Sequence, residues 1–185
     1  MTSPCKLCHC LCSSAICPPR LNFPRGFPDE YSLMATFRMI KSTVGKVWNV
    51  WQVVDEDGHK MAGLRLNGDQ QALEYFLMGV DGNLQTVTFP GLSVLFNTKW
   101  HKVMIGVERD QVTLYVDCHP VDRRPIKEKV PVTTEGDTLI GRLDADADAS
   151  VVVSGDGEEH LIAFVQQGQL SHRAVVSALL GRARV

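Results

Sequence analysis

The sequence predicts an all-β fold, an antiparallel sandwich of two sheets, from two observations. Segments with a strand pattern recur at roughly 8–12-residue spacing between residues 29 and 153, with turn signals between them. Over the same range, the apolar residues show no helical period longer than a turn. With 185 residues and 44% hydrophobic side chains, the chain can bury the core that such a sandwich needs.

The strand pattern is clearest at residues 31–39, where every odd position is apolar and polar residues such as Ser32, Thr36 and Arg38 lie between. This period of two indicates a strand with one buried face. Residues 47–54 (VWNVWQVV) are apolar on both faces, which favours a central strand covered on both sides. Further strands are predicted at residues 61–66, 72–78, 84–89, 100–107, 111–117 and 138–143.

The predicted strands are separated by short turn signals: Asp57-Gly58, Asn67-Gly68, Asp81-Gly82 and Arg109-Asp110. Glycine or a small polar residue there can take the positive φ that tight hairpins need. Three tryptophans lie inside strand patterns: Trp48, Trp51 and Trp100. We expect them in the core rather than on a ligand-binding surface.

Residues 1–27 are expected to form an irregular leader with little fixed structure. They hold five of the six cysteines and four prolines and show no strand or helix period. The stretch LCHCLCSSAIC at 7–17 is interrupted by polar residues, whereas a secretory signal has an unbroken apolar run of about 7–15 residues. We therefore expect no convincing signal peptide here.

The leader cysteines allow three interpretations. They are Cys5, Cys8, Cys10, Cys12 and Cys17. Five thiols and a histidine could hold zinc or copper, but a second cysteine pair at a loop-forming distance is missing. The favoured interpretation is a leader whose thiols have no folded role, and disulfides to other chains are the third.

Residues 154–185 are expected to form a divergent tail after a domain at 28–153. Within LSHRAVVSALLGRARV, Ser171 is predicted to cap a short helix that Gly181 ends. Its apolar face would carry Ala174, Val175, Ala178 and Leu179. Such a helix has no obvious place in a sandwich.

Composition and motifs exclude several classes of function. A net charge of −2 argues against a dedicated nucleic-acid binder. No apolar run approaches the ~18–20 residues that cross a membrane. The sequence lacks a nucleophile elbow, a phosphate loop, a dinucleotide fingerprint and a His-Glu-x-x-His zinc motif. We therefore expect a non-enzymatic protein without catalytic residues, metal or cofactor.

A basic segment is the candidate binding site. Arg123, Arg124, Lys127 and Lys129 outnumber Asp122 and Glu128. A local charge of +2, near strand ends that bear further cations, could hold a sulfated polysaccharide through several charge pairs. Taken by itself, the segment is interpreted first as an ordinary solvated loop.

An acidic segment suggests a second possibility. Asp144, Asp146 and Asp148 have the spacing of the first three ligands of a calcium loop, but the sixth and twelfth positions hold Ala149 and Gly155 instead of glycine and glutamate. A solvated acidic turn is favoured over weak calcium binding. A calcium-dependent, lectin-like domain is the alternative function.

Four segments resemble one family: FPRGFPDEYSLMATFRM (23–39), WNVWQVVDEDG (48–58), KWHKVMIGVERDQVTLYVDC (99–118) and TLIGRLD (138–144). They are similar to the thrombospondin N-terminal-like, laminin-G-like domain of fibril-associated collagens. The Trp-His … Leu-Tyr-Val-Asp-Cys block is the most specific element. The resemblance implies a concanavalin-like jelly roll and covers residues 23–153.

The resemblance also implies a function. In that family the domain is a non-enzymatic module of a secreted, trimeric matrix protein, and some members bind heparin-like chains or other matrix proteins. We therefore expect an extracellular, matrix-binding module that forms a collagen trimer only in a longer form. Within it, Arg123, Arg124, Lys127 and Lys129 are the chemical counterparts of a glycosaminoglycan site.

The chain departs from the family after residue 153. Family members continue with a final strand whose cysteine pairs with the position of Cys118, whereas here residues 154–185 stand in its place. We therefore expect a truncated or alternatively ended product in which Cys118 lacks its usual disulfide partner. A third possibility is an inactive product with an unpaired sheet edge.

Overall fold

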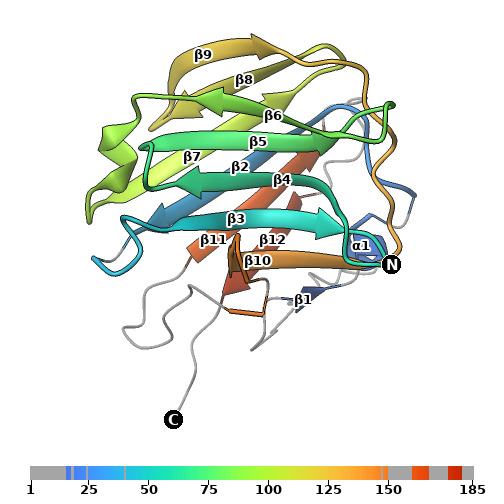
Figure 1. The fold of residues 1–185 in the computed structure, drawn as a ribbon, viewed down its shortest axis with the longest axis horizontal. Coiled ribbons are helices and arrows are strands. Elements are labelled where there is room, and N and C mark those ends of the chain that lie inside the picture. The colour runs from blue at the N-terminus through green and yellow to red at the C-terminus, as the bar shows by residue number, and fades with distance from the viewer. Residues whose placement is uncertain are drawn as a thin grey trace, which may run out of the picture.

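The computed structural model describes residues 16–17, 19–23, 25–39, 41–146, 148–149, 160–166 and 175–180. Of these, residues 16–17, 21–22, 160–166 and 175–180 are described by their backbone only. The described residues form two six-stranded antiparallel sheets that pack face to face (Figure 1). Two short helical turns, α1 (Pro19–Asn22) and η1 (Ser93–Phe96), accompany them. The all-β sandwich predicted from the sequence is confirmed.

Each sheet has a simple strand order. Sheet A runs β1 (Ile16–Cys17), β10 (Asp137–Leu143), β3 (Val47–Val54), β4 (Lys60–Asn67), β5 (Ala72–Met78) and β6 (Leu84–Phe89). Sheet B runs β12 (Val175–Leu180), β11 (His160–Gln166), β2 (Tyr31–Arg38), β7 (Trp100–Val107), β8 (Gln111–Val116) and β9 (His119–Pro125). The eight strands predicted from periodicity all occur, with ends within a residue of those expected.

The core lies between the sheets and follows from strand alternation. In β2 the odd residues are buried and the even ones half-buried, as the period of two predicts. The hydroxyl oxygens of Tyr31 and Tyr75 lie 2.7 Å apart and join the two sheets within this core. Burial raises the pKa of both phenols, so both stay neutral donors and acceptors. Because a buried hydroxyl without a hydrogen bond is unfavourable, each of the two tyrosines serves as the hydrogen-bond partner of the other.

Strand β3 confirms the prediction of a doubly covered strand. It lies between β10 and β4, and seven of its eight residues are buried. Trp48 and Trp51 belong to the core, as expected. Trp100 was expected there too, but its side chain is 40% exposed, because it opens β7 on the outer face of sheet B.

Three expectations about the ends and edges are wrong. The leader has fixed structure at its end, because β1 pairs with β10 and Phe23 packs into the core with Phe27, their ring centroids 4.5 Å apart. The basic segment begins as strand β9, not as a loop. Every residue of β9 is exposed, so it shows no apolar alternation that a sequence pattern could reveal.

The C-terminal helix is the third error. Residues Val175–Leu180 form strand β12, which pairs with β11 from His160↔Leu180 to Val165↔Val175. Strand β11 in turn pairs with β2. The closing strand that was expected to be missing is therefore present as β11. Its pairing satisfies the backbone hydrogen-bonding groups along β2. Ser171 and Gly181, the predicted cap and stop, lie outside the described residues, as do Cys5 to Cys12.

Candidate functional site

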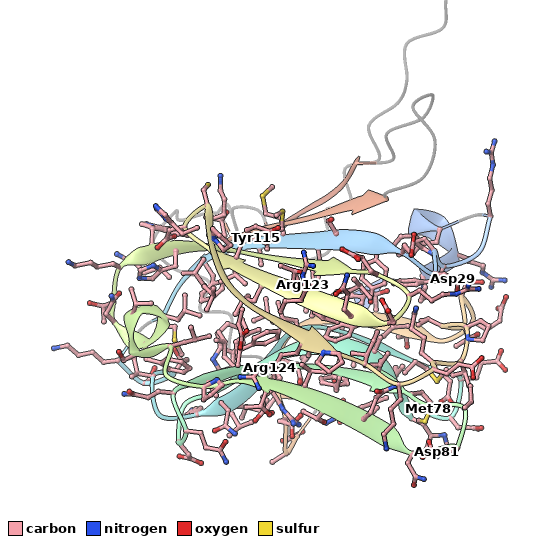
Figure 2. All side chains as sticks on the ribbon, turned by 90° about the horizontal axis from the view of Figure 1, so that it is seen from above. Asp29, Met78, Asp81, Tyr115, Arg123 and Arg124 are labelled. Carbon is pink, nitrogen blue, oxygen red and sulfur yellow. The ribbon has the colours of Figure 1, made fainter. Side chains whose placement is uncertain are left out.

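The predicted basic residues lie on and after the edge strand β9. Arg123 pairs with Thr113 and Arg124 with the core residue Val112, so the two arginines project to opposite faces of sheet B. Figure 2 shows Arg123 over the outer face of the sheet and Arg124 on the side of sheet A. The two neighbouring arginines therefore do not form one compact cluster.

Arg124 is partly neutralised. Its Nε donates to Asp122 Oδ2 at 2.7 Å, and Asp122 Oδ1 accepts the backbone N–H of Arg123 at 2.8 Å. Both partners of the ion pair are more than two-fifths exposed, so the pair contributes little stability. The carboxylate mainly lowers the positive field around Arg124.

The two lysines follow β9 in a segment that ties the sheets together at this edge. The Lys127 backbone exchanges two hydrogen bonds with the Gln85 side chain, at 2.9 and 3.1 Å. Lys129 forms a β-bridge with Gly79, next to the β5–β6 hairpin. A groove of about 360 Å³ lies here, and Lys127 and Asp81 both line it. The structure therefore places the four cations on one continuous segment at this edge of the sandwich, with Arg123 and Arg124 on opposite faces.

The acidic segment does not assemble as a calcium loop would. The Asp144 carboxylate accepts hydrogen bonds from Lys60 Nζ at 2.6 Å, Arg65 Nη1 at 3.0 Å and Asn49 Nδ2 at 3.1 Å. Burial alone would raise the pKa of Asp144, but these bonds and charges hold it below its usual value. Asp146 Oδ1 instead accepts the backbone N–H of Asp148 at 3.0 Å.

Sequence reasoning missed the network around Asp144. Arg65 also bonds Glu74, with Nη2 2.6 Å from Oε2, and these groups sit on the outer face of sheet A. The Phe76 ring underlies both cations, with Lys60 Nζ 5.8 Å and Arg65 Cζ 5.5 Å from its centroid. The network joins β4, β5 and the end of β10. Its members are far apart in the sequence, so they can be identified as neighbours only when the strand register is known.

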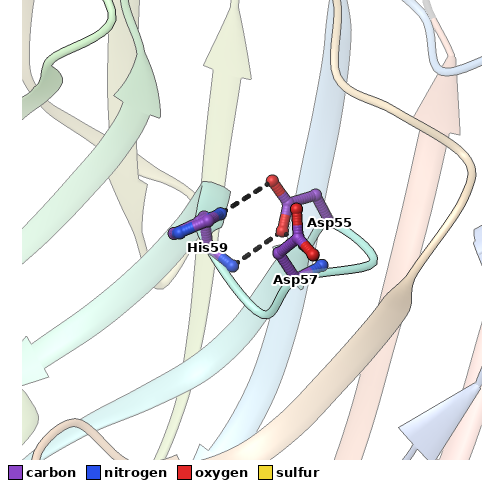
Figure 3. Close-up of side chains that lie close together, drawn as sticks. All are labelled: Asp55, Asp57 and His59. Atoms are coloured by element: carbon purple, nitrogen blue, oxygen red, sulfur yellow. Dashed lines mark hydrogen bonds and ion pairs between the residues drawn. The ribbon is translucent and has the colours of Figure 1, made fainter.

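A second group of acids lies in the β3–β4 turn (Figure 3). Asp55 Oδ1 accepts the backbone N–H groups of Asp57 and His59 at 3.0 and 2.8 Å, while Oδ2 lies 3.2 Å from His59 Nδ1. Desolvation alone would raise the pKa of Asp55, but the hydrogen bonds and the neighbouring His59 together lower it. Since the carboxylate caps its own turn, its role is to close the hairpin.

Cys118 lies at the tip of the β8–β9 hairpin. Asp117 and Cys118 have φ of 49° and 67°, the two positive values of a type I′ turn. Asp117 is held by His101, whose Nδ1 lies 2.8 Å from its Oδ2, and by the Lys102 backbone N–H at 2.8 Å. The Trp-His … Asp-Cys block thus builds this turn. Cys118 is exposed and free within the described part of the chain.

The fold and these surfaces define a β-sandwich of the laminin-G-like, jelly-roll class, in which exposed edges and turns carry the polar chemistry. The receptor-binding domain of a botulinum neurotoxin C/D mosaic serotype shares this fold, with a TM-score of 0.55, 14% identity and coverage of 72% of this chain and 34% of that one. No protein-family profile matches the chain.

Curated relatives identify the family. The human collagen alpha-1(XVI) chain is 34% identical over 129 residues, which cover 70% of this chain and 8% of that one. The human collagen alpha-1(XIX) chain is 30% identical, with coverage of 67% and 11%, and the Xenopus laevis collagen alpha-1(XXI) chain 30%, with 66% and 13%. The chain belongs with the fibril-associated collagens, and its matched region is consistent with their thrombospondin N-terminal-like domain.

This homology supports a matrix-associated module of structural or binding type. The chain spans only about a tenth of the length of these collagen chains. Within the described residues, none of the helices combines the length and the apolar character that crossing a membrane requires.

Proposed function

We propose that this chain is a non-catalytic, extracellular matrix-binding module that holds sulfated glycosaminoglycans along β9 and residues 126–130. The observation that supports the proposal is the succession of four cations along one continuous segment at this edge. From Arg123 to Lys129 the chain spans at most about 20 Å at ~3.3 Å per residue. Cations spaced along such a segment suit an extended polyanion better than a compact anion.

The chemistry predicts weak and salt-sensitive binding. Arginine offers a planar donor fork to sulfate or carboxylate oxygens, and lysine adds a point charge. All the side chains of β9 are exposed, so each contact is screened by solvent and salt. Because Asp122 and Glu128 lie among the cations, affinity has to come from several contacts at once.

The test is chromatography of the full chain on immobilised heparin with a salt gradient. The Arg123→Gln, Lys127→Gln double variant should elute at clearly lower salt than the unmodified protein. The matched control is Lys41→Gln, Lys46→Gln, which removes the same charge from two exposed residues of the turn before β3. If both double variants elute together, net charge rather than this edge governs retention, and the proposed site is wrong.

Secretion, other matrix proteins as ligands and trimer formation in a longer form belong to the same proposal. They are supported by the collagen homologues and by a surface with charged edges. Cys118 would remain available for a disulfide with a second chain, because its turn presents it to solvent.

A further inference from the structure

The outer face of sheet B carries an apolar row where strand alternation usually places polar groups. Met34 of β2 lies opposite Met104 of β7, and Met104 lies opposite Tyr115 of β8. All three side chains are half-buried. We call this three-residue set the Met–Tyr row. It crosses three neighbouring strands, with the small residues Ser32 and Gly106 beside it.

On β2 and β7, charges of opposite sign lie at the two ends of this face, while Arg123 of β9 adds a cation beside the acidic end. Glu30 directly precedes β2 and Glu108 directly follows β7, so both acids lie at one end. Arg38 closes β2 at the other end, where its Cζ lies 5.9 Å from the centroid of the Trp100 ring. Lys102 projects from β7 near that same end.

The Met–Tyr row is the midpoint of this charge pattern. Along β2, Met34 is four residues from Glu30 and four from Arg38. Along β7, Met104 is four residues from Trp100 and four from Glu108. A face whose charge changes sign about a central apolar row is complementary to itself, because half a turn about that row exchanges its two ends.

We propose that this face binds a second copy of the chain through a two-fold axis that runs along the Met–Tyr row. The row then packs on its counterpart, and Glu30 of one copy lies over Arg38 of the other at both ends. Such an interface is isologous and closes at two subunits. Arg123 of the proposed glycosaminoglycan site lies on this same outer face, beside β8, so dimer formation is tested without heparin and with variants at other residues.

The area of the proposed interface limits the affinity of the dimer. Three strands ~4.8 Å apart and nine residues at ~3.3 Å each give about 430 Å² per copy. The total of about 860 Å² is below the ~1,200–2,000 Å² of stable complexes. The dimer should therefore be weak, form only at high protein concentration, and weaken with salt.

Sedimentation equilibrium of the full chain between about 10 µM and 1 mM tests the proposal, since Kd of 1 mM to 1 µM corresponds to weak association. The unmodified chain should shift from monomer to dimer across this range. Met34→Glu should stay monomeric, because it places two carboxylates against each other on the axis. Val80→Glu, at a residue 59% exposed in the β5–β6 hairpin, is the matched control and should still dimerise.

A charge exchange makes the test specific. Glu30→Lys alone and Arg38→Glu alone each place like charges together, so each should dimerise less than the unmodified chain. An equimolar mixture of the two variants restores opposite charges at both ends and should form a heterodimer. Thermal melts of each variant check that it is folded. A monomeric unmodified chain at 1 mM, or folded variants whose mixture associates no better than either alone, would overturn the proposal.

Discussion

Replacing Asp144 by alanine should destabilise the protein by about 2–4 kcal/mol. Its carboxylate is 22% exposed and accepts hydrogen bonds from Lys60, Arg65 and Asn49. Hydrogen bonds to charged groups contribute ~1.5–3 kcal/mol each, and removing one partner of a buried pair costs ~3–5 kcal/mol. Because Asp144 is partly exposed and Arg65 keeps its pair with Glu74, the expected cost lies below that of a fully buried pair, at about 2–4 kcal/mol.

Urea unfolding followed by circular dichroism would measure this change. The pKa of Asp144 is lowered in the folded state, so its contribution is complete above the unfolded value of ~3.9 and is lost as the pH falls through the folded value. The difference between Asp144→Ala and the unmodified chain should therefore be large at pH 7 and shrink below pH ~4. A loss under ~0.5 kcal/mol at pH 7 would refute the reasoning.

Calcium separates the two roles weighed for Asp144. If the carboxylate is a partner of Lys60 and Arg65, millimolar calcium should leave the melting temperatures of both proteins unchanged, because a ligand stabilises only the state it binds. A rise in Tm for the unmodified chain that is absent in Asp144→Ala would instead establish a calcium site there.

Two further predictions concern the core. Tyr75→Phe should cost about 1–3 kcal/mol in urea unfolding, because it leaves the buried Tyr31 hydroxyl unpaired, and adding Tyr31→Phe should recover part of the loss. Additive losses would contradict this. Gly63→Ala should lower Tm, because its Cβ would lie 2.2 Å from Phe76 Cζ and 2.8 Å from the Trp51 carbonyl oxygen. Gly45→Ala, where a Cβ meets open space, is the control and should melt nearly as the unmodified chain does.

The sequence could predict strands that bury one face or two, because burial imposes a pattern. β2 and β3 are examples, and their ends were predicted closely. β9 could not be predicted in this way, since an edge strand with seven exposed residues follows no apolar rule. β12 was mistaken for a helix because Ala178 and Leu179 fit both periods, and pairing with β11 decides between them.

The sequence indicates which charged residues could belong to the candidate site, but not how their side chains are arranged in space. The charges of Arg123 and Arg124 are evident in the sequence, whereas their opposite faces depend on β9 being a strand. Likewise, Asp144 belongs to the acidic run in sequence but contacts Lys60, 84 residues away, in the fold. The division into residues 1–27, 28–153 and 154–185 stays a prediction.

The glycosaminoglycan site is tested most directly by lysine acetylation of the full chain, with and without heparin, read out by mass spectrometry. We predict that heparin protects Lys127 and Lys129, while the exposed Lys41 and Lys46 are acetylated as fast as in free protein. Equal acetylation of Lys127 and Lys129 in both samples, under conditions in which heparin binds, would contradict the proposed site.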